Sequence, residues 1–402
     1  MDLGPRSHAA ATLLACNRDV LDGRPSEGDV PKALALRGWS SYLLELDEAA
    51  VDTLETLGLE AQWPRGAPES LLELANNVRV ACRIPMAPSL SSLSTRARRF
   101  EKPRKHRQVE AFAQLVVPLA KKAERVVDVG SGHGHLTRAL ADRLGVPVLG
   151  LERDEALAHK ARTLANAGSA KFAVADVITG GLALSARDCV VGLHACGELG
   201  DAMVESAARS GASIALIGCC LQKRRTASRS PLGCDAEHDD AQQRALDLPK
   251  AILGLSNLTA REEGVETSRV ENIRARERRL ALHRLLREAG VALELGAEID
   301  GLNRRAAHAQ LDTLVARAFE RRGLAVPARA AIDAAAHWAA IHHARMRRLA
   351  LPRSLLGRLL EVFVLLDRAR HLERAGFAVD VSVAFPASVS ARNLALVAAR
   401  PS

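Results

Sequence analysis

The sequence predicts an α/β fold in which five parallel strands and a closing pair of strands form one sheet. A helical unit precedes this sheet, and a helical insertion follows its fifth strand. Between residues 108 and 220, short apolar segments alternate with helical ones. Strands that are apolar on both faces are typical of parallel sheets covered by helices on both sides. After residue 220, arginine-rich helical segments replace this alternation, and two more strand-like segments end the chain.

The strands of the core are expected where runs of Val, Ile, Leu and Ala lie between turn residues. The five predicted parallel strands are Arg125–Val129, Pro147–Glu152, Lys171–Val177, Cys189–His194 and Ser213–Cys220. The predicted helices between them are Leu136–Leu144, Glu155–Ala167 and Leu199–Arg209. The predicted closing strands are Ala378–Phe385 and Asn393–Arg400.

Four segments of different pattern indicate the domain organisation. Apolar residues recur at helical spacing after Trp39 and Ala50, which predicts a helical N-terminal domain over residues 1–92. The predicted core covers residues 93–220, the helical insertion expected to face the substrate covers residues 221–350, and residues 351–402 return to the core. The helices expected beyond residue 220 are Arg269–Ala289, Ala306–Arg321, Ala328–Leu349 and Ser354–Ala375.

Composition limits the class of protein. The chain has 402 residues, 48% of them hydrophobic, which suits two or three units with buried cores. The seven cysteines follow no regular disulfide spacing, which favours a reducing, cytoplasmic location. We expect no secretory signal, and no apolar run reaches the about 18 residues of a membrane span. Aromatic residues, at 3%, are too few to favour a protein that stacks single-stranded bases.

The most specific motif is Asp128-Val-Gly-Ser-Gly-His-Gly134, which follows a predicted strand and precedes a predicted helix. Glycines permit a sharp turn and close ligand approach, and a helix N-terminus attracts negative charge. A dinucleotide fingerprint places its third glycine one residue later. The pattern here is that of class I methyltransferases, so we expect S-adenosylmethionine (SAM), with a nicotinamide cofactor or no ligand as weaker alternatives. The predicted contacts are Asp128, Gly130, Ser131, Gly132 and Gly134.

Two further acids are expected at the same edge of the sheet. Glu152 ends the second predicted strand, where a carboxylate accepts hydrogen bonds from both ribose hydroxyls. Asp176, followed by Val177, ends the third strand and is placed to receive the adenine amino group. Because the carboxyl ends of parallel strands meet at one edge, Asp128, Glu152 and Asp176 are expected to line one crevice.

Lys105 and Gln108 lie in the helix that leads into the first strand. Two interpretations stay open for them. They either cover the carboxylate end of the cofactor or belong to a solvent-facing start of the helix. On the first interpretation we count both among the predicted cofactor contacts.

A second group of polar residues follows the fourth and fifth strands. It contains His194 and Cys196 after one strand and Cys219-Cys220 after the next. His194 is a candidate general base or positioning residue, and Cys196 a candidate nucleophile, although no Pro-Cys motif supports that chemistry. A metal site from His194, Cys196 and one of Cys219/Cys220 is a further alternative. We expect adjacent strand residues to face opposite sides, so both of these cysteines should not ligate one ion. Buried packing beneath the cofactor is the fourth interpretation, and we predict no metal site.

The net charge of +9 is unevenly distributed. The first 100 residues hold 11 Lys and Arg against 13 Asp and Glu, so the remainder carries +11. Such clusters either contact phosphates of an RNA partner or form solvated faces, and the arginine excess can also reflect GC-rich coding. The clusters named as possible RNA contacts are Arg96–Arg107, Lys223–Arg225, Arg274–Arg279 and Arg345–Arg348.

Five motifs together resemble a known family. They are Lys105-His-Arg-Gln-Val109, Asp128–Leu136, Gly192-Leu-His-Ala-Cys-Gly-Glu-Leu199, Gly218-Cys-Cys220 and Ser390-Ala-Arg-Asn-Leu-Ala-Leu396. In order and spacing this set resembles the methyltransferase-like 25 / ribosomal RNA adenine dimethylase domain-containing group and its bacterial relatives, over roughly residues 100–220 and 355–400. Arg107-Gln108 stand where animal members have His-Glu. The resemblance implies a class I, Rossmann-like core that binds SAM at Gly130, Gly132, Glu152 and Asp176, and it supplies no substrate.

These observations lead to an expected function and its alternatives. We expect a cytoplasmic SAM-dependent methyltransferase acting on tRNA, rRNA or another polyanionic acceptor. The fourth strand lacks the Asp/Asn-Pro-Pro-Tyr/Phe motif that positions exocyclic base nitrogens, which argues against N6-adenine and N4-cytosine chemistry. There are two alternatives. One is a methyltransferase with a protein or small-molecule acceptor, and the other is a SAM-binding regulatory or assembly protein without turnover. The oligomeric state stays open.

Overall fold

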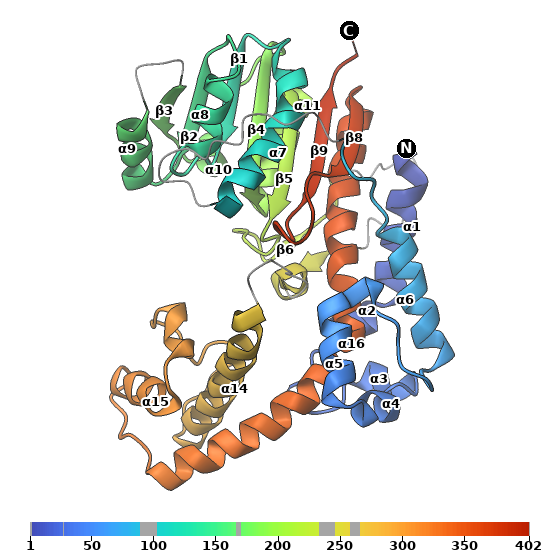
Figure 1. Ribbon diagram of the computed structural model, residues 1–402, viewed down its shortest axis with the longest axis vertical. Coiled ribbons are helices and arrows are strands. Elements are labelled where there is room, and N and C mark those ends of the chain that lie inside the picture. Colours follow the sequence, from blue (N-terminus) through green and yellow to red (C-terminus); the bar gives the residue numbers. More distant parts are fainter. Residues whose placement is uncertain are drawn as a thin grey trace. The chain divides into compact units, whose positions relative to one another are not determined.

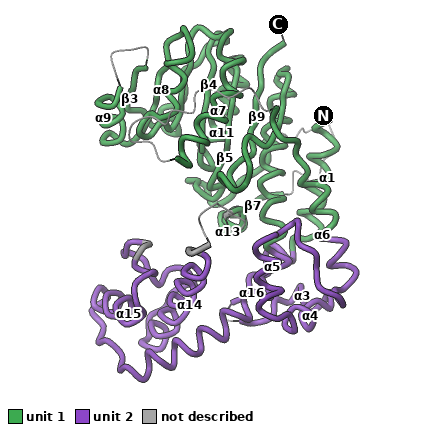
Figure 2. Tube along the Cα trace, viewed as in Figure 1, with its two compact units in different colours: residues 1–18, 76–262, 354–402 green, residues 19–75, 263–353 purple. Residues whose placement is uncertain are grey.

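A computed structural model describes residues 2–26, 28–88, 103–165, 170–232, 246–257 and 266–401. Residues 96–102 of the first basic cluster and Cys234 lie outside this range. The chain forms two compact units (Figure 2). Unit 1 contains residues 1–18, 76–262 and 354–402, and unit 2 contains residues 19–75 and 263–353. Parts of the predicted N-terminal domain and of the predicted insertion therefore belong to the same unit.

Unit 1 is built on a seven-stranded sheet in the order β3-β2-β1-β4-β5-β9-β8 (Figure 1). Strands β1 to β5 are parallel, and β9 pairs antiparallel with both β5 and β8. The predicted sheet of five parallel strands and a closing hairpin is thus confirmed. The strands are β1 (Arg125–Val129), β2 (Val148–Glu152), β3 (Ala170–Val174), β4 (Asp188–Cys196), β5 (Ser213–Cys219), β8 (Ala378–Val383) and β9 (Leu394–Ala399), with the separate pair β6 (Ser228–Arg229) and β7 (Leu248–Pro249).

Helices cover both faces of this sheet. On one face, α7 (Pro103–Ala120) and α8 (His135–Ala141) bury apolar residues such as Phe112 and Leu140 against Val191 of β4. On the other face, Met203 of α11 (Glu198–Ser210) packs against Gly192, and neighbouring strand residues point to opposite faces. The remaining helices of this unit are α1 (Leu3–Cys16), α6 (Glu69–Ala81, completed by residues of unit 2), α9 (Glu155–Leu164), α10 (Val177–Gly180), α13 (Lys250–Leu253) and η2 (Gly254–Asn257).

The third strand is shorter than the sequence predicts. Strand β3 ends at Val174, and Asp176 is instead the N-cap of α10. Its carboxylate accepts hydrogen bonds from the Ile178 N–H and the Thr179 hydroxyl, both at 3.0 Å. The predicted strand over Lys171–Val177 is therefore wrong at its end, because an aspartate that caps a helix competes with strand extension.

One long helix replaces two predicted ones. Helix α16 runs from Arg329 to Arg374 and includes Pro352, whereas the sequence predicts separate helices on either side of that proline. A proline removes one backbone hydrogen bond, and here buried neighbours such as Leu351 and Leu356 favour continued helix. Elsewhere, two helices replace one predicted helix. The predicted helix Ala306–Arg321 is divided into η3 (Arg304–His308) and α15 (Leu311–Glu320).

Unit 2 is helical. The core of its C-terminal part is formed by α14 (Glu266–Glu288), α15 and the first half of α16, with Leu285, Leu314 and Phe319 buried together. Its N-terminal helices are α2 (Arg18–Asp22), α3 (Lys32–Leu36), α4 (Ser40–Glu45), α5 (Glu48–Leu57) and η1 (Gly58–Glu60). No helix within the described ranges combines the length and the apolar character needed to cross a membrane.

Two predicted RNA-contacting clusters make ion pairs inside unit 2. Arg347 is 8% exposed and bonds Glu48, Asp52 and Glu55 at 2.6–2.8 Å. Arg348 pairs with Glu48 at 2.7 Å, and Arg345 donates to the Gly28 carbonyl. In the other cluster, Arg274 and Arg278 pair with Glu271, and Arg279 pairs with Glu298.

Replacement of Arg347 by methionine should therefore affect stability rather than RNA binding. Loss of this guanidinium removes one ion-pair partner from each of three carboxylates, which keep Arg348 or Arg269, so we expect the free energy of unfolding to fall by about 1–3 kcal/mol. RNA affinity should stay unchanged, as measured by filter binding at matched folded fraction. Arg317→Met, on the exposed face of α15, is the control and should change neither quantity. A selective loss of RNA affinity in Arg347→Met would contradict this assignment.

Candidate functional site

The glycine segment forms the turn between β1 and α8. Gly130, Gly132 and Gly134 have φ values of +71°, +54° and +71°, a region that disfavours other residues. A Cβ atom on Gly134 would lie 2.4 Å from the ring of Phe172, whereas one on Gly132 would meet nothing within 4 Å. Gly134 is thus required by packing, whereas Gly132 borders open space.

Glu152 is held against this turn. It is the last residue of β2, and the Gly132 N–H donates to its Oε2 at 2.9 Å while the Asp154 N–H donates to its Oε1 at 3.0 Å. The neighbouring Ser131 Oγ is buried without a hydrogen-bond partner. A buried hydroxyl without a partner is uncommon and marks a position where a ligand atom would satisfy it.

The other two predicted acids are engaged differently. Asp128 is 2% exposed and accepts a 2.6 Å hydrogen bond from the Thr137 hydroxyl. Burial raises the pKa of Asp128 to about 6, against the opposing effect of that hydrogen bond. The Asp176 carboxylate forms an ion pair with Arg225 at 2.8 Å, and the Thr179 hydrogen bond lowers its pKa. Of the three acids, Glu152 is therefore the one bonded to the glycine turn, and Val177 lies buried at the start of α10.

His194 occupies an irregularity at the end of β4. The register with β5 shifts between Leu193 and Ala195, and His194 has a φ of +71°, which is rare outside glycine. Its Nε2 lies 2.9 Å from Oε1 of Gln108, a residue of α7 that is 3% exposed. Gln108 is thus not part of a solvent-facing helix start. This pair was not predicted, although a glutamine beside the apolar Val109 was a signal that it points inward.

The surroundings of His194 are electropositive. Burial lowers its pKa to about 4, and the charges of Lys105 and Arg104 act in the same direction, as does Arg392. The imidazole is therefore neutral near pH 7 and is a weak proton acceptor. Its geometry suits a residue that positions a neighbouring group through a hydrogen bond.

Nuclear magnetic resonance tests this assignment. With its pKa near 4, the ring of His194 should show no titration between about pH 6 and pH 8, unlike an exposed histidine with a pKa of about 6.5. Gln108→Glu places a carboxylate next to the ring and should raise the pKa of His194. A midpoint near 6.5 in the wild-type protein would contradict the observed burial.

Three thiols gather beside His194. Cys196 and Cys219 are register partners on β4 and β5, and their Sγ atoms lie 3.1 Å apart. Cys220 has a φ of +43° and leaves the strand direction, so its Sγ joins the other two within 4.8 Å. The expectation that Cys219 and Cys220 face opposite sides is wrong, because the left-handed turn begins at Cys220.

The three thiols share charge unevenly. Hydrogen bonds from Cys196 and Cys219 lower the pKa of Cys220, and Lys223 and Arg392 add to this effect. The hydrogen bond with Cys196 raises the pKa of Cys219, whose thiol also donates to the His194 carbonyl at 3.1 Å. Of the three thiols, Cys220 is the one whose pKa is lowered.

The segment after β5 is fixed by a buried ionic cluster. Asp201 of α11 accepts hydrogen bonds from Arg224 at 2.6 Å, Arg368 at 2.9 Å and Arg229 at 3.1 Å. Asp367 of α16 pairs with Arg229 at 2.6 Å. In the predicted cluster Lys223–Arg225, the two arginines are thus paired with acids, and Lys223 is exposed next to the thiols.

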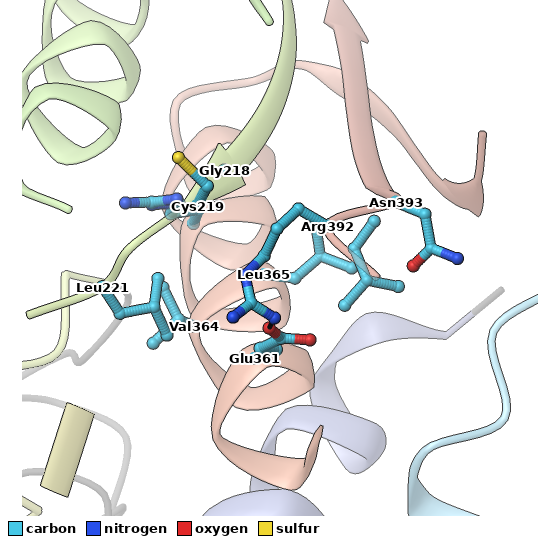
Figure 3. Close-up of a pocket in the computed structure, with 10 residues that line it drawn as sticks. Gly218, Cys219, Leu221, Glu361, Val364, Leu365, Arg392 and Asn393 are labelled. Carbon is cyan, nitrogen blue, oxygen red and sulfur yellow. Dashed lines mark hydrogen bonds and ion pairs between the residues drawn. The ribbon is translucent and has the colours of Figure 1, made fainter. Parts of the chain in front are cut away.

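A small cavity of about 30 Å³ lies between β5, α16 and the start of β9 (Figure 3). Gly218, Cys219 and Arg392 line it, and its size suits a single water molecule. It adjoins the thiol cluster and is separate from the glycine turn.

Comparison with known proteins identifies the type of domain that the core forms. Residues 104–227 match the family model of a methyltransferase domain. The match, the sheet order and the glycine turn together identify this core as a methyltransferase domain with the predicted class I, Rossmann-like fold. The family model supports the predicted enzyme class and SAM as the cofactor. The individual cofactor contacts stay predictions.

Solved methyltransferase structures overlap with part of the chain. A TehB-like SAM-dependent methyltransferase from Corynebacterium glutamicum is 21% identical over 26% of this chain and 61% of its own, with a TM-score of 0.22. A magnesium protoporphyrin IX methyltransferase from Synechocystis is 26% identical over 28% of this chain and 54% of its own, with a TM-score of 0.23. A complex of a Haloferax volcanii methyltransferase activator with a methyltransferase overlaps at 20% identity over 28% and 54%, with a TM-score of 0.23. This chain spans little more than half the length of these structures.

Proposed function

We propose that the protein transfers a methyl group from SAM to an acceptor in tRNA or rRNA, bound at the carboxyl ends of β4 and β5. The observation that carries the acceptor class is the positive charge around His194. Arg104 and Lys105 act on this ring, and Lys223 acts on the adjoining thiols. Arg392 also acts on the ring, but it is paired with Glu361 at 2.6 Å. A positive site attracts a phosphate backbone and fixes its position.

The residues of the glycine turn fit the cofactor. Gly132 borders open space, the carboxylate of Glu152 is held by the Gly132 N–H, and the buried Ser131 hydroxyl has no hydrogen-bond partner. SAM supplies an activated methyl group when bound, so the chain's own task is to bind and align the acceptor. Lys105 and Asp128, which interact electrostatically near this edge, are proposed to complete the cofactor contacts.

His194 and Gln108 are proposed as positioning residues for the acceptor. Their contact crosses from β4 to α7, and a neutral imidazole donates or accepts one hydrogen bond without carrying charge. Cys196 lies two residues further along the same edge and is the second candidate for contact with the acceptor. Five motifs resemble those of the methyltransferase-like 25 group, which supports an enzyme of that group. The seven cysteines lack a regular disulfide spacing, which supports a cytoplasmic location.

Methyl labelling of cell fractions tests the proposal. Extracts of a deletion strain are incubated with the purified full chain and tritiated SAM, then separated into RNA, protein and metabolites. We expect label in RNA, and a fall in labelling when Arg104 and Lys105 are both replaced by glutamine. Label confined to protein or metabolites would exclude an RNA acceptor.

A protein or small-molecule acceptor is the second candidate. It is favoured by the ion pairs of Arg347, Arg348 and Arg279, which engage these arginines inside unit 2. Affinity for RNA that does not fall steeply with salt would support this candidate. SAM binding without S-adenosylhomocysteine formation in any fraction would instead indicate a binding protein without turnover.

A further inference from the structure

We propose that Cys196, Cys219 and Cys220 together bind a zinc ion at the end of β4 and β5. Their three Sγ atoms lie within 4.8 Å of one another. Zinc takes cysteine sulfur at about 2.3 Å in a tetrahedral arrangement, which requires sulfur atoms about 3.8 Å apart. The Cys196 and Cys219 Sγ atoms lie 3.1 Å apart, slightly closer than this value, and the Sγ of Cys220 lies within 4.8 Å of both, so small side-chain rotations suffice.

The backbone holds the three thiols in place without a metal. Cys196 and Cys219 are opposite each other in the β4–β5 ladder, and the Gly197 N–H donates to the Cys219 carbonyl at 2.9 Å. The left-handed φ of Cys220 is what turns the third thiol toward the pair. A non-glycine residue in this conformation stores strain, and such strain is concentrated at functional sites. The arrangement is therefore a property of the scaffold rather than of flexible side chains.

The surrounding charges suit a zinc–thiolate centre. Three thiolates and one Zn²⁺ carry a net charge of −1, and binding releases the thiol protons to solvent. Lys223 is exposed three residues after Cys220 and would offset that charge, whereas Arg392, which lines a cavity together with Cys219, is paired with Glu361 at 2.6 Å. Cys219 is buried while Cys196 and Cys220 are partly exposed, which leaves the ion accessible from one side.

The fourth coordination position has no protein ligand in the described part of the chain, where the group contains only these three residues. Zinc sites with three protein ligands keep the fourth position for water or a substrate atom. The thiol cluster itself lies beside His194, whose carbonyl accepts hydrogen bonds from Cys219 and Cys196. The proposal does not depend on the acceptor class, since metal content is measured without any methyl transfer.

Metal analysis of the full chain tests the site. The protein is purified under reducing conditions from zinc-supplemented cells, and zinc is quantified by mass spectrometry. We expect about one zinc per chain, and about a fivefold or larger loss in each of Cys196→Ser, Cys219→Ser and Cys220→Ser. Cys16→Ser, at an exposed cysteine of α1, is the matched control and should keep the metal. Cobalt substitution should give a thiolate charge-transfer absorption that the three variants lack.

A measurement on the wild-type protein guards against misfolded variants. Zinc should protect Cys196 and Cys220 from alkylation by iodoacetamide, and a chelator should expose them, while labelling of Cys16 stays constant. Wild-type protein that takes up no zinc after reduction and reconstitution would overturn the proposal. The same holds if the variants retain full zinc, or if the isolated protein contains a Cys196–Cys219 disulfide and binds no metal once reduced.

Discussion

Asp201→Asn is expected to lower the free energy of unfolding by about 3–5 kcal/mol, the range measured when one partner of a buried ion pair is removed. The carboxylate is the shared acceptor of Arg224, Arg229 and Arg368, whose side chains are no more than 9% exposed. Without it, three buried guanidinium groups have only Asp367 as a negative partner within this cluster. Chemical denaturation followed by circular dichroism measures the change.

The pH dependence of this loss follows from the direction of the pKa shift. Despite burial, the three arginines hold the pKa of Asp201 well below its usual range. The folded state thus binds fewer protons, and the stabilisation is complete above the unfolded pKa of about 4. The difference between wild type and Asp201→Asn should therefore narrow as the pH falls below about 4. Glu205→Gln, on the same helix and without an ion pair to a described residue, should cost little; an equal loss in both variants would refute the role of the cluster.

Gly197→Ala is expected to disrupt the contact between the end of β4 and the segment after β5. Gly197 has φ +45° and ψ −113°, and a Cβ atom there would lie 2.3 Å from the carbonyl oxygen of Lys223. Because this contact is with backbone, the segment after β5 must move, and Gly197 also accepts a hydrogen bond from Arg368. Backbone strain and overpacking together should lower the free energy of unfolding by about 2–5 kcal/mol.

A glycine that has a positive φ but no close neighbour serves as the control, because its replacement causes backbone strain without overpacking. Gly376 has φ +84°, and a Cβ atom there would meet nothing within 4 Å, so Gly376→Ala should cost only about 1–2 kcal/mol. Both variants are compared by thermal and denaturant unfolding. Equal losses would show that conformation alone, and not the contact with Lys223, makes Gly197 necessary.

The sheet and the glycine turn were predictable because their signals are local. Runs of apolar residues define β1, β2 and β5 to within two residues, and three alternating glycines require the turn that φ values of +54° to +71° confirm. Glu152 follows from its place at a strand end. One error arises where a local pattern is ambiguous. The side chain of Asp176 caps α10, so β3 ends before it, and the apolar residues that precede Asp176 do not indicate this strand end.

Contacts between distant segments were not predictable. The pairing of Arg347 with Glu48, Asp52 and Glu55 joins residues about three hundred positions apart, so a basic cluster that resembles an RNA contact forms ion pairs within unit 2. Cys196, Cys219 and Cys220 lie together because Cys220 has a positive φ. No sequence pattern predicts a positive φ at a residue other than glycine. The contact between Gln108 and His194 requires α7 to cover the end of β4, which follows only from the assembled sheet.

Calorimetric titration of the full chain with SAM tests the central claim, that the glycine turn and Glu152 form a methyl-donor site. We predict one SAM bound per chain and an affinity about 10- to 100-fold weaker in Glu152→Ala, since hydrogen bonds to a charged group are lost. Glu155→Ala, an exposed acid three residues further along, is the matched control and should bind like wild type. Absence of binding to the folded wild-type chain, or an unchanged affinity in Glu152→Ala, would contradict the account.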